Sequence, residues 1–96
     1  MSTEDLVKDK REDILRIAAR HGAHNVRIFG SAARREAGPG SDLDILVDMK
    51  PGRTLLDLIA IEQDLEDLLG RKVDVLTEGA ISPYMREGVL RDAVLL

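Results

Sequence analysis

Three aspartates stand at positions where their carboxylates could share metal ions. Asp42 and Asp44 lie two residues apart in the run Ser41-Asp42-Leu43-Asp44, and residues two apart along a strand point to the same face. Two neighbouring carboxylates repel each other, and a divalent cation between them removes that penalty. Mg²⁺ is commonly held by one or two carboxylates together with substrate phosphates. A solvated strand face that carries two aspartates is the structural alternative.

Asp74, in the run Lys72-Val73-Asp74-Val75-Leu76, is the third candidate. Aspartate is disfavoured in strands, so an isolated one in a short strand calls for a reason. If this strand lies beside that of Asp42 and Asp44, the three carboxylates would meet. Two-metal sites for phosphoryl transfer clamp the attacking and leaving oxygens, and a further carboxylate can act as base for the acceptor hydroxyl.

The pair Gly30-Ser31 follows a short run that is rich in strand-forming residues. Glycine has no Cβ and lets the backbone approach a ligand closely. The free amides at the start of a helix, together with a serine hydroxyl, suit a phosphate group. The pair therefore indicates a phosphate contact, with an ordinary turn and helix cap as the alternative.

These residues need strands and helices to position them, and the apolar pattern predicts an alternating order. Leu43, Ile45 and Val47 alternate with acidic residues, which is typical of a strand with one buried face. The predicted elements are a helix over 4–21, a strand over 25–29, helical turns over 31–36, a strand over 42–48, a helix over 54–69, a strand over 72–76 and a helix from 82 to about 94, with a loop at Gly38-Pro39-Gly40. The fold class is α/β, a small mixed sheet of about three strands packed with helices.

Length and composition limit the function classes further. The 96 residues form a single domain, 1–96, that is 44% hydrophobic and 33% charged, as in globular proteins. No apolar run approaches the roughly 20 residues of a membrane span, the charged residues 1–13 lack the apolar segment of a signal peptide, and we expect a cytoplasmic protein. Without cysteine there is no disulfide or thiolate site. A net charge of −4 and only two aromatic residues disfavour direct binding of nucleic acid.

The combination of these motifs resembles the nucleotidyltransferase signature of the DNA polymerase β superfamily. That signature runs G-S-x-A-R, a short loop, S-D-x-D and a later strand carboxylate. Here its elements are Gly30-Ser31-Ala32-Ala33-Arg34, Ser41-Asp42-Leu43-Asp44 and Asp74. The stretch Asn25-Val26-Arg27-Ile28-Phe29-Gly30 is most similar to the minimal nucleotidyltransferase branch. The resemblance spans roughly residues 12 to 95 and implies a palm-like fold.

The resemblance also implies an activity and a partner. Minimal nucleotidyltransferases are typically antitoxins that adenylylate a tyrosine of a HEPN-domain toxin, a helical ribonuclease, with ATP and Mg²⁺. By this resemblance Gly30, Ser31 and Arg34 bind the nucleotide, and Asp42, Asp44 and Asp74 are catalytic and hold two Mg²⁺ ions. We expect a hetero-oligomer with the toxin and no membrane association.

Two other functions compete with this interpretation. The first is a non-catalytic antitoxin, a binding module that neutralises its partner by complex formation. The second is a nucleotidyltransferase for small molecules such as aminoglycosides, but such enzymes carry further domains for the acceptor. Transfer of labelled AMP to a partner protein separates the first alternative from the enzyme.

Overall fold

The computed structural model describes residues 3–30 and 42–96, which form helices and strands. In chain order the elements are α1 (Thr3–Asp9), α2 (Arg11–Arg20), β1 (Ala23–Phe29), β2 (Leu43–Met49), α3 (Leu55–Leu69), β3 (Val73–Leu76), the 3₁₀ turn η1 (Glu78–Ala80), α4 (Pro83–Asp92) and β4 (Val94–Leu95). The predicted helical turns over 31–36 and the loop at Gly38-Pro39-Gly40 lie outside the described residues. In the ranges that are described, no helix has the length and apolar character needed to cross a membrane.

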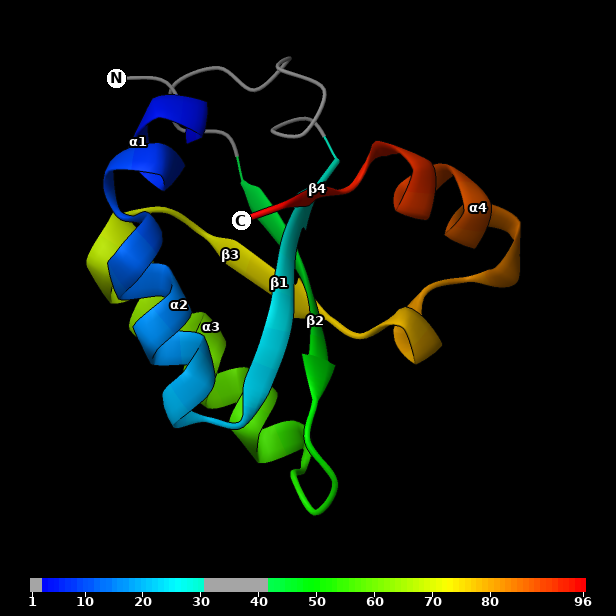
Figure 1. The fold of residues 1–96 in the computed structure, drawn as a ribbon, viewed down its shortest axis with the longest axis horizontal. Helices are drawn as coiled ribbons and strands as arrows, with labels where there is room; N and C mark the ends of the chain where they lie inside the picture. The colour runs from blue at the N-terminus through cyan, green and yellow to red at the C-terminus, as the bar shows by residue number, and fades with distance from the viewer. Residues whose placement is uncertain (1–2, 31–41) are drawn as a thin grey trace.

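One mixed sheet organises the molecule, with the strand order β3-β2-β1-β4 (Figure 1). β1 runs antiparallel to β2 and β4, whereas β2 and β3 are parallel. A parallel pair needs a long crossover connection, and α3 supplies it. The predicted α/β class and the three predicted strands are confirmed. β4 is a fourth strand, and its two residues are too few to show an alternating pattern.

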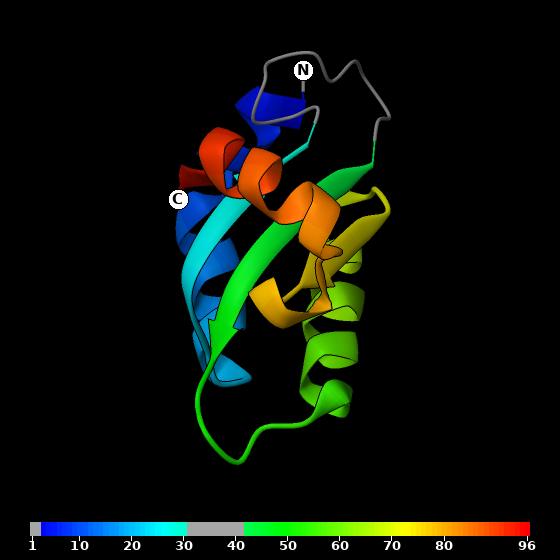
Figure 2. The ribbon, with the colours of Figure 1, turned by 90° about the vertical axis from the view of Figure 1, so that its right-hand side faces the viewer.

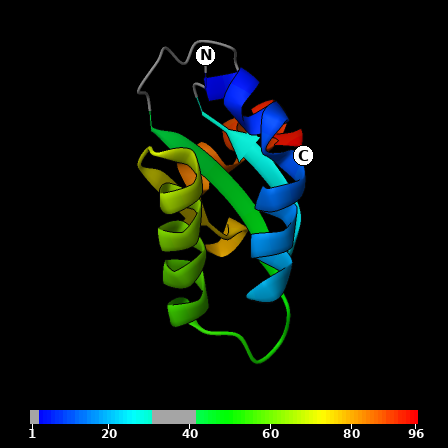
Figure 3. The same cartoon turned by 90° about the vertical axis from the view of Figure 1, so that its left-hand side faces the viewer.

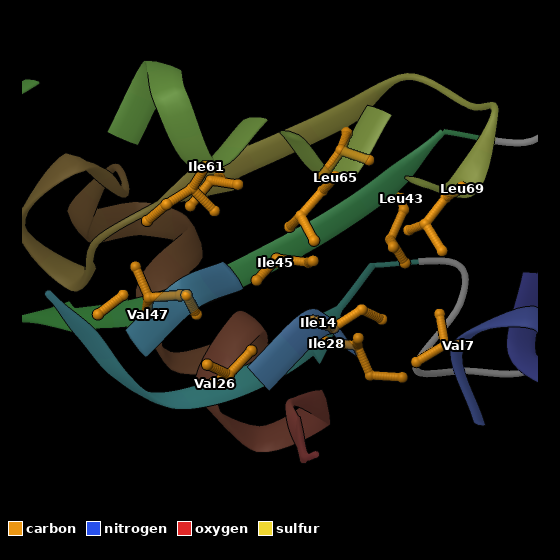
Figure 4. Packing of buried hydrophobic residues seen from close by; sticks show 14 residues of the cluster. Val7, Ile14, Val26, Ile28, Leu43, Ile45, Val47, Ile61, Leu65 and Leu69 are labelled. Carbon is orange, nitrogen blue, oxygen red and sulfur yellow. The ribbon is translucent and has the colours of Figure 1, made fainter. Parts of the chain in front are cut away.

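The helices α2 and α3 cover one face of the sheet (Figure 3). Leu43, Ile45 and Val47 are fully buried on this face, as their alternation predicted. They pack with Ile14 of α2 and Ile61 of α3 in the main hydrophobic core, which Figure 4 shows. Since a buried Leu or Ile truncated to Ala costs about 2–5 kcal/mol, this core fixes which face of β2 carries the aspartates.

Helix α3 begins and ends where the sequence predicts. The Thr54 hydroxyl accepts a hydrogen bond from the Leu56 amide, and the Thr54 amide donates to the Asp57 carboxylate at 2.9 Å. This reciprocal pair is a capping box, which satisfies amides that the first turn leaves without partners. Gly70 ends the helix in the left-handed conformation, with φ at 66°. The crossover between the two parallel strands is thus defined at both ends.

The helix predicted over 4–21 is wrong in one respect, because it is not continuous. It divides at Lys10, whose backbone angles of φ −103° and ψ 14° are not helical. Val7 of α1 and Ile14 of α2 both remain buried in the main core. Apolar periodicity was satisfied on both sides of the break, so the pattern alone could not reveal it.

The opposite face of the sheet is covered more thinly, by η1 and α4 (Figure 2). A small apolar cluster of Phe29, Leu46 and Ile81 holds these segments to the sheet, with Val89 packed against it. No residue of α4 is buried. The last helix ends at Asp92, slightly before the predicted end near Val94, because the chain there extends into β4.

The edge strand β3 has its outward amides covered by α3. The Val73 amide donates to a Glu66 carboxylate oxygen at 3.0 Å, and the Val75 amide donates to Glu62 at 3.4 Å. Amides at the edge of a sheet otherwise remain open to another strand. The helix that connects β2 to β3 therefore also closes the outer edge of β3.

Candidate functional site

Asp44 and Asp74 lie side by side on the face of the sheet that α2 and α3 do not cover. They are register partners on the parallel strands β2 and β3, and both side chains are half-buried. Neighbouring strands are about 4.8 Å apart, and residues in register leave the sheet on the same face. The prediction that Asp74 shares a face with Asp44 is confirmed.

Gly30 follows β1 and lies directly against Asp44. Its φ is +72°, a conformation that residues with a Cβ rarely adopt, and an added Cβ would lie 2.5 Å from Oδ2 of Asp44. Phe29, the preceding residue, is the register partner of Asp44 across the β1–β2 pair. Glycine at position 30 therefore lets the backbone turn close to the Asp44 carboxylate, a requirement that the phosphate interpretation of Gly30 did not include.

The remaining predicted site residues are placed less fully. Asp42 is exposed and directly precedes β2, two residues from Asp44. Ser31 and Arg34 lie outside the described residues, so their nucleotide-binding roles stay predictions. The assignment of Asp42 as a catalytic metal ligand stays a prediction as well.

The carboxylates of Asp44 and Asp74 fit a magnesium ion if a nucleotide supplies further ligands. Within residues 3–30 and 42–96, no three side chains of His, Cys, Asp or Glu converge as the ligands of a metal ion would. Mg²⁺ does not require such a cage, because it is commonly bound by one or two carboxylates plus substrate phosphates. The carboxylate pair on β2 and β3 therefore fits Mg²⁺ that shares its coordination with a nucleotide.

The other end of the same sheet face carries a second set of acidic side chains, which the sequence did not reveal. Arg27 donates to Asp48 at 2.9 Å and to Glu78 at 3.0 Å, and its side chain is only 13% exposed. The side-chain Nδ2 of Asn25 donates to the second Asp48 oxygen at 2.8 Å. We call Arg27, Asp48 and Glu78 the arginine end of this face, and Asp44 with Asp74 the carboxylate end. Asp48 is thus a structural partner of Arg27.

Helix α4 adds residues to the carboxylate end that sequence reasoning did not identify. A pocket of about 570 Å³ lies next to Asp44. Its lining residues come from β1, the turn after it, β2 and α4, namely Phe29, Gly30, Asp44, Met85, Gly88, Val89 and Asp92. The one available signal was Gly88, since glycine inside a helix costs about 1 kcal/mol relative to alanine and suggests a requirement for space.

The chain is similar to a known family and to several named proteins. The family described as "Nucleotidyltransferase domain" matches residues 11–96. A Methanocaldococcus jannaschii protein, named as a candidate protein adenylyltransferase, is 41% identical over 88 residues, which are 92% of this chain and 95% of that protein. The protein adenylyltransferase MntA of Thermococcus cleftensis is 40% identical over 75 residues, covering 78% of this chain and 76% of its own length.

Solved structures share the fold. A structure described as a candidate minimal nucleotidyltransferase superposes with a TM-score of 0.87 at 48% identity, covering all of this chain and 97% of its own. A toxin–antitoxin structure with AMP-PNP superposes with a TM-score of 0.72 at 20% identity, covering 92% of this chain and 70% of that one. At that identity the second match shows a common fold.

Proposed function

The chain belongs to the nucleotidyltransferase family, in its minimal branch, and from this premise we propose that it transfers AMP from ATP to a tyrosine of a HEPN-type toxin. The observation that carries the proposal is the register pair of Asp44 and Asp74 beside the Gly30 turn. Carboxylates of this kind stand at the centre of sites for phosphoryl transfer. The relatives named as protein adenylyltransferases match most of the chain, which supports a protein acceptor.

The proposed reaction joins the tyrosine oxygen to the α-phosphorus of ATP and releases pyrophosphate. Asp74 takes the proton of the attacking hydroxyl, a role for which a carboxylate beside the reacting oxygen is suited. Gly30, Ser31 and Arg34 hold the triphosphate, so that the α-phosphorus faces the acceptor. The product is an O-adenylylated tyrosine.

Asp42, Asp44 and Asp74 are the residues proposed to hold Mg²⁺, with two ions as the full complement. When bound, the ions would neutralise charge on the phosphates and stabilise the attacking and leaving oxygens. The carboxylates of Asp44 and Asp74 also repel each other in the protein alone, which favours binding of a cation between them. ATP and Mg²⁺ are both available in the cytoplasm, where we place the protein.

The toxin partner is supported by the neighbours in structure and by the surface of α4. One structural neighbour is a toxin–antitoxin structure that contains AMP-PNP. In this chain, Tyr84 is 98% exposed and Met85 is 62% exposed on α4, and Leu95 of β4 is 66% exposed. Exposed apolar side chains on neighbouring elements are typical of a surface that binds another protein. A hetero-oligomer is the assembly that we propose.

The same exposed side chains favour one alternative, a non-catalytic antitoxin that neutralises its partner by complex formation. The two functions differ in what happens to the partner. In the enzyme, the partner carries AMP after the encounter. In the binding module, the partner is unmodified and is inhibited only while it is covered.

Intact-mass spectrometry of the protein encoded next to this one, after co-expression of both, tests the proposal. We expect the partner to gain one or more AMP groups, and we expect Asp42→Ala to lose both modification and neutralisation. An unmodified but inhibited partner would establish the binding module instead. Full neutralisation by Asp42→Ala would lead to the same conclusion.

A further inference from the structure

The first half of α3 exposes apolar side chains on its outer face. Leu55 is 70% exposed, Leu56 is 75% exposed and Ile59 is 41% exposed, whereas Ile61 and Leu65 on the inner side of the helix are fully buried. Residues three and four apart on a helix are neighbours, so the three exposed side chains form one continuous surface, which we call the α3 patch. Adjacent exposed apolar side chains are typical of a surface that binds another protein.

The α3 patch lies far from the candidate site. α3 covers the face of the sheet opposite to Asp44 and Asp74 (Figure 3). It begins after the loop that follows the end of β2, whereas Asp44 is the second residue of that strand. A protein that binds the α3 patch therefore leaves the carboxylate end and α4 accessible.

The charged side chains of α3 are all acidic, and one of them lacks a partner. They are Asp57, Glu62, Asp64, Glu66 and Asp67. The first four make hydrogen bonds to neighbouring side chains or backbone amides. Asp67 is exposed, and its side chain makes no hydrogen bond or ion pair with any described residue. An acidic side chain in the last turn opposes the helix dipole, and that turn has no basic residue, so a cation from another molecule would stabilise it.

The loop that precedes α3 carries the complementary charge. Lys50 is exposed, and within the described part of the chain its side chain also has no hydrogen-bond or ion-pair partner. The nearby Arg53 already pairs with Asp57 at 3.4 Å. Lys50 and Asp67 thus stand toward opposite ends of a helix of 15 residues, which is about 22 Å long. A surface that is basic at one end, apolar next to it and acidic at the other end complements a copy of itself turned by 180°.

We propose that two copies of this chain associate through the α3 patch, with their α3 helices antiparallel about a two-fold axis between Leu56 and Ile59. Leu56 of one copy packs against Ile59 of the other. The acidic last turn with Asp67 then lies beside the loop of Lys50 in the other copy. A single pair of helices of this length forms a small interface, so we expect a dissociation constant for the dimer that is about micromolar or weaker.

The dimer keeps both candidate sites open. Since the α3 patch and the carboxylate end belong to opposite faces of the sheet, the two carboxylate ends point away from the two-fold axis. Each copy can then bind its own nucleotide and its own partner protein. The inference goes beyond the proposed function, because self-association requires neither ATP nor a toxin.

Sedimentation equilibrium of the full chain, from about 1 μM to about 1 mM, tests the association. We expect a monomer–dimer equilibrium in which Leu56→Glu raises the dissociation constant by about tenfold or more, because both copies carry the substitution. Glutamate suits the first turn of a helix, and thermal melting checks that the variant is folded. Leu95→Glu is the matched control, since Leu95 is 66% exposed but belongs to β4, and it should leave the constant unchanged.

Reversal of the two unpaired charges tests the antiparallel arrangement. We expect Lys50→Glu and Asp67→Lys each to raise the dissociation constant of the dimer by about threefold, and the double variant to return it close to the wild-type value. Restoration requires that opposite ends of the two helices meet. A double variant that associates more weakly than either single variant would overturn the arrangement.

Three results would overturn the proposal as a whole. The first is a wild-type protein that stays monomeric at about 1 mM. The second is a dimer that Leu95→Glu disrupts and Leu56→Glu does not. The third is a monomeric wild-type protein whose Leu56→Glu variant loses binding to the protein encoded next to it, which would assign the α3 patch to that partner. None of these measurements uses ATP or Mg²⁺, so failure of the proposed function would leave their outcome unchanged.

Discussion

The acidic side chains at the two ends of one sheet face differ in their partners. At the arginine end, Arg27 bridges Asp48 and Glu78, and its guanidinium is largely withdrawn from solvent. At the carboxylate end, Asp44 and Asp74 are register neighbours, and among the described residues Asp74 makes no hydrogen bond or ion pair through its side chain. At the arginine end the protein compensates two acidic side chains with its own cation, whereas among the described residues it supplies no such partner to Asp74.

Neutralisation of one carboxylate at each end gives the largest expected effect. We expect Asp44→Asn to lower AMP transfer by about 100-fold or more, as loss of one electrostatic contact to the reacting groups commonly does. Its melting temperature in the absence of metal should stay the same or rise, because one of two repelling charges is removed. Asp48→Asn should keep transfer and lose stability. Transfer of label from ATP and thermal melting measure both; a large loss of stability in Asp44→Asn would make Asp44 structural.

Removal of the cation at the arginine end tests the comparison from the other side. Arg27→Met leaves two carboxylates without their partner and should reduce the free energy of unfolding by about 2 kcal/mol. Arg16→Met is the control, because the Arg16–Asp13 pair is exposed and should contribute less than about 0.5 kcal/mol. Urea unfolding of both variants measures the difference. Equal losses would mean that Arg27 acts as an ordinary surface arginine.

Substitution of Gly30 should give a smaller effect. A matched substitution at Gly52 separates backbone strain from contact with Asp44. Gly30→Ala and Gly52→Ala both place a Cβ at positive φ, at +72° and +87°, and each should lose about 1 kcal/mol of stability. Only the Cβ at position 30 meets Asp44, since nothing lies within 4 Å at position 52. We therefore expect AMP transfer to fall in Gly30→Ala alone. Equal activity in the two variants would show that the close approach of Gly30 to Asp44 does not matter for transfer.

Ligand binding should produce the smallest shift, and it should depend on the carboxylate end only. A ligand at a concentration equal to its Kd stabilises a protein by about 0.4 kcal/mol. We expect Mg²⁺ and ATP together to raise the melting temperature by more than the sum of their separate shifts. The excess should persist in Asp48→Asn and disappear in Asp74→Asn. Strictly additive shifts in the wild-type protein would contradict a shared site.

Sequence patterns within single strands and helices predicted the parts of the site that one strand or helix positions. The alternation in β2 placed Asp44 opposite the core, and Thr54 and Gly70 defined α3, which brings β3 beside β2. The arginine end could not be predicted this way, because Arg27, Asp48 and Glu78 come from three elements that meet only after the sheet and η1 have formed. The pocket beneath α4 likewise depends on how a loosely attached helix lies over the sheet.

The cover that α3 places over the edge of β3 limits how this protein can associate with others. Glu66 and Glu62 occupy the amides of Val73 and Val75 that a foreign strand would need. The opposite edge, β4, offers a strand of only two residues. Addition of a foreign strand to the sheet is the route to β-aggregates. It is therefore disfavoured at β3, and β4 offers too few residues for a foreign strand to pair with. With both edges of the sheet poor templates for strand addition, side-chain surfaces remain available for docking.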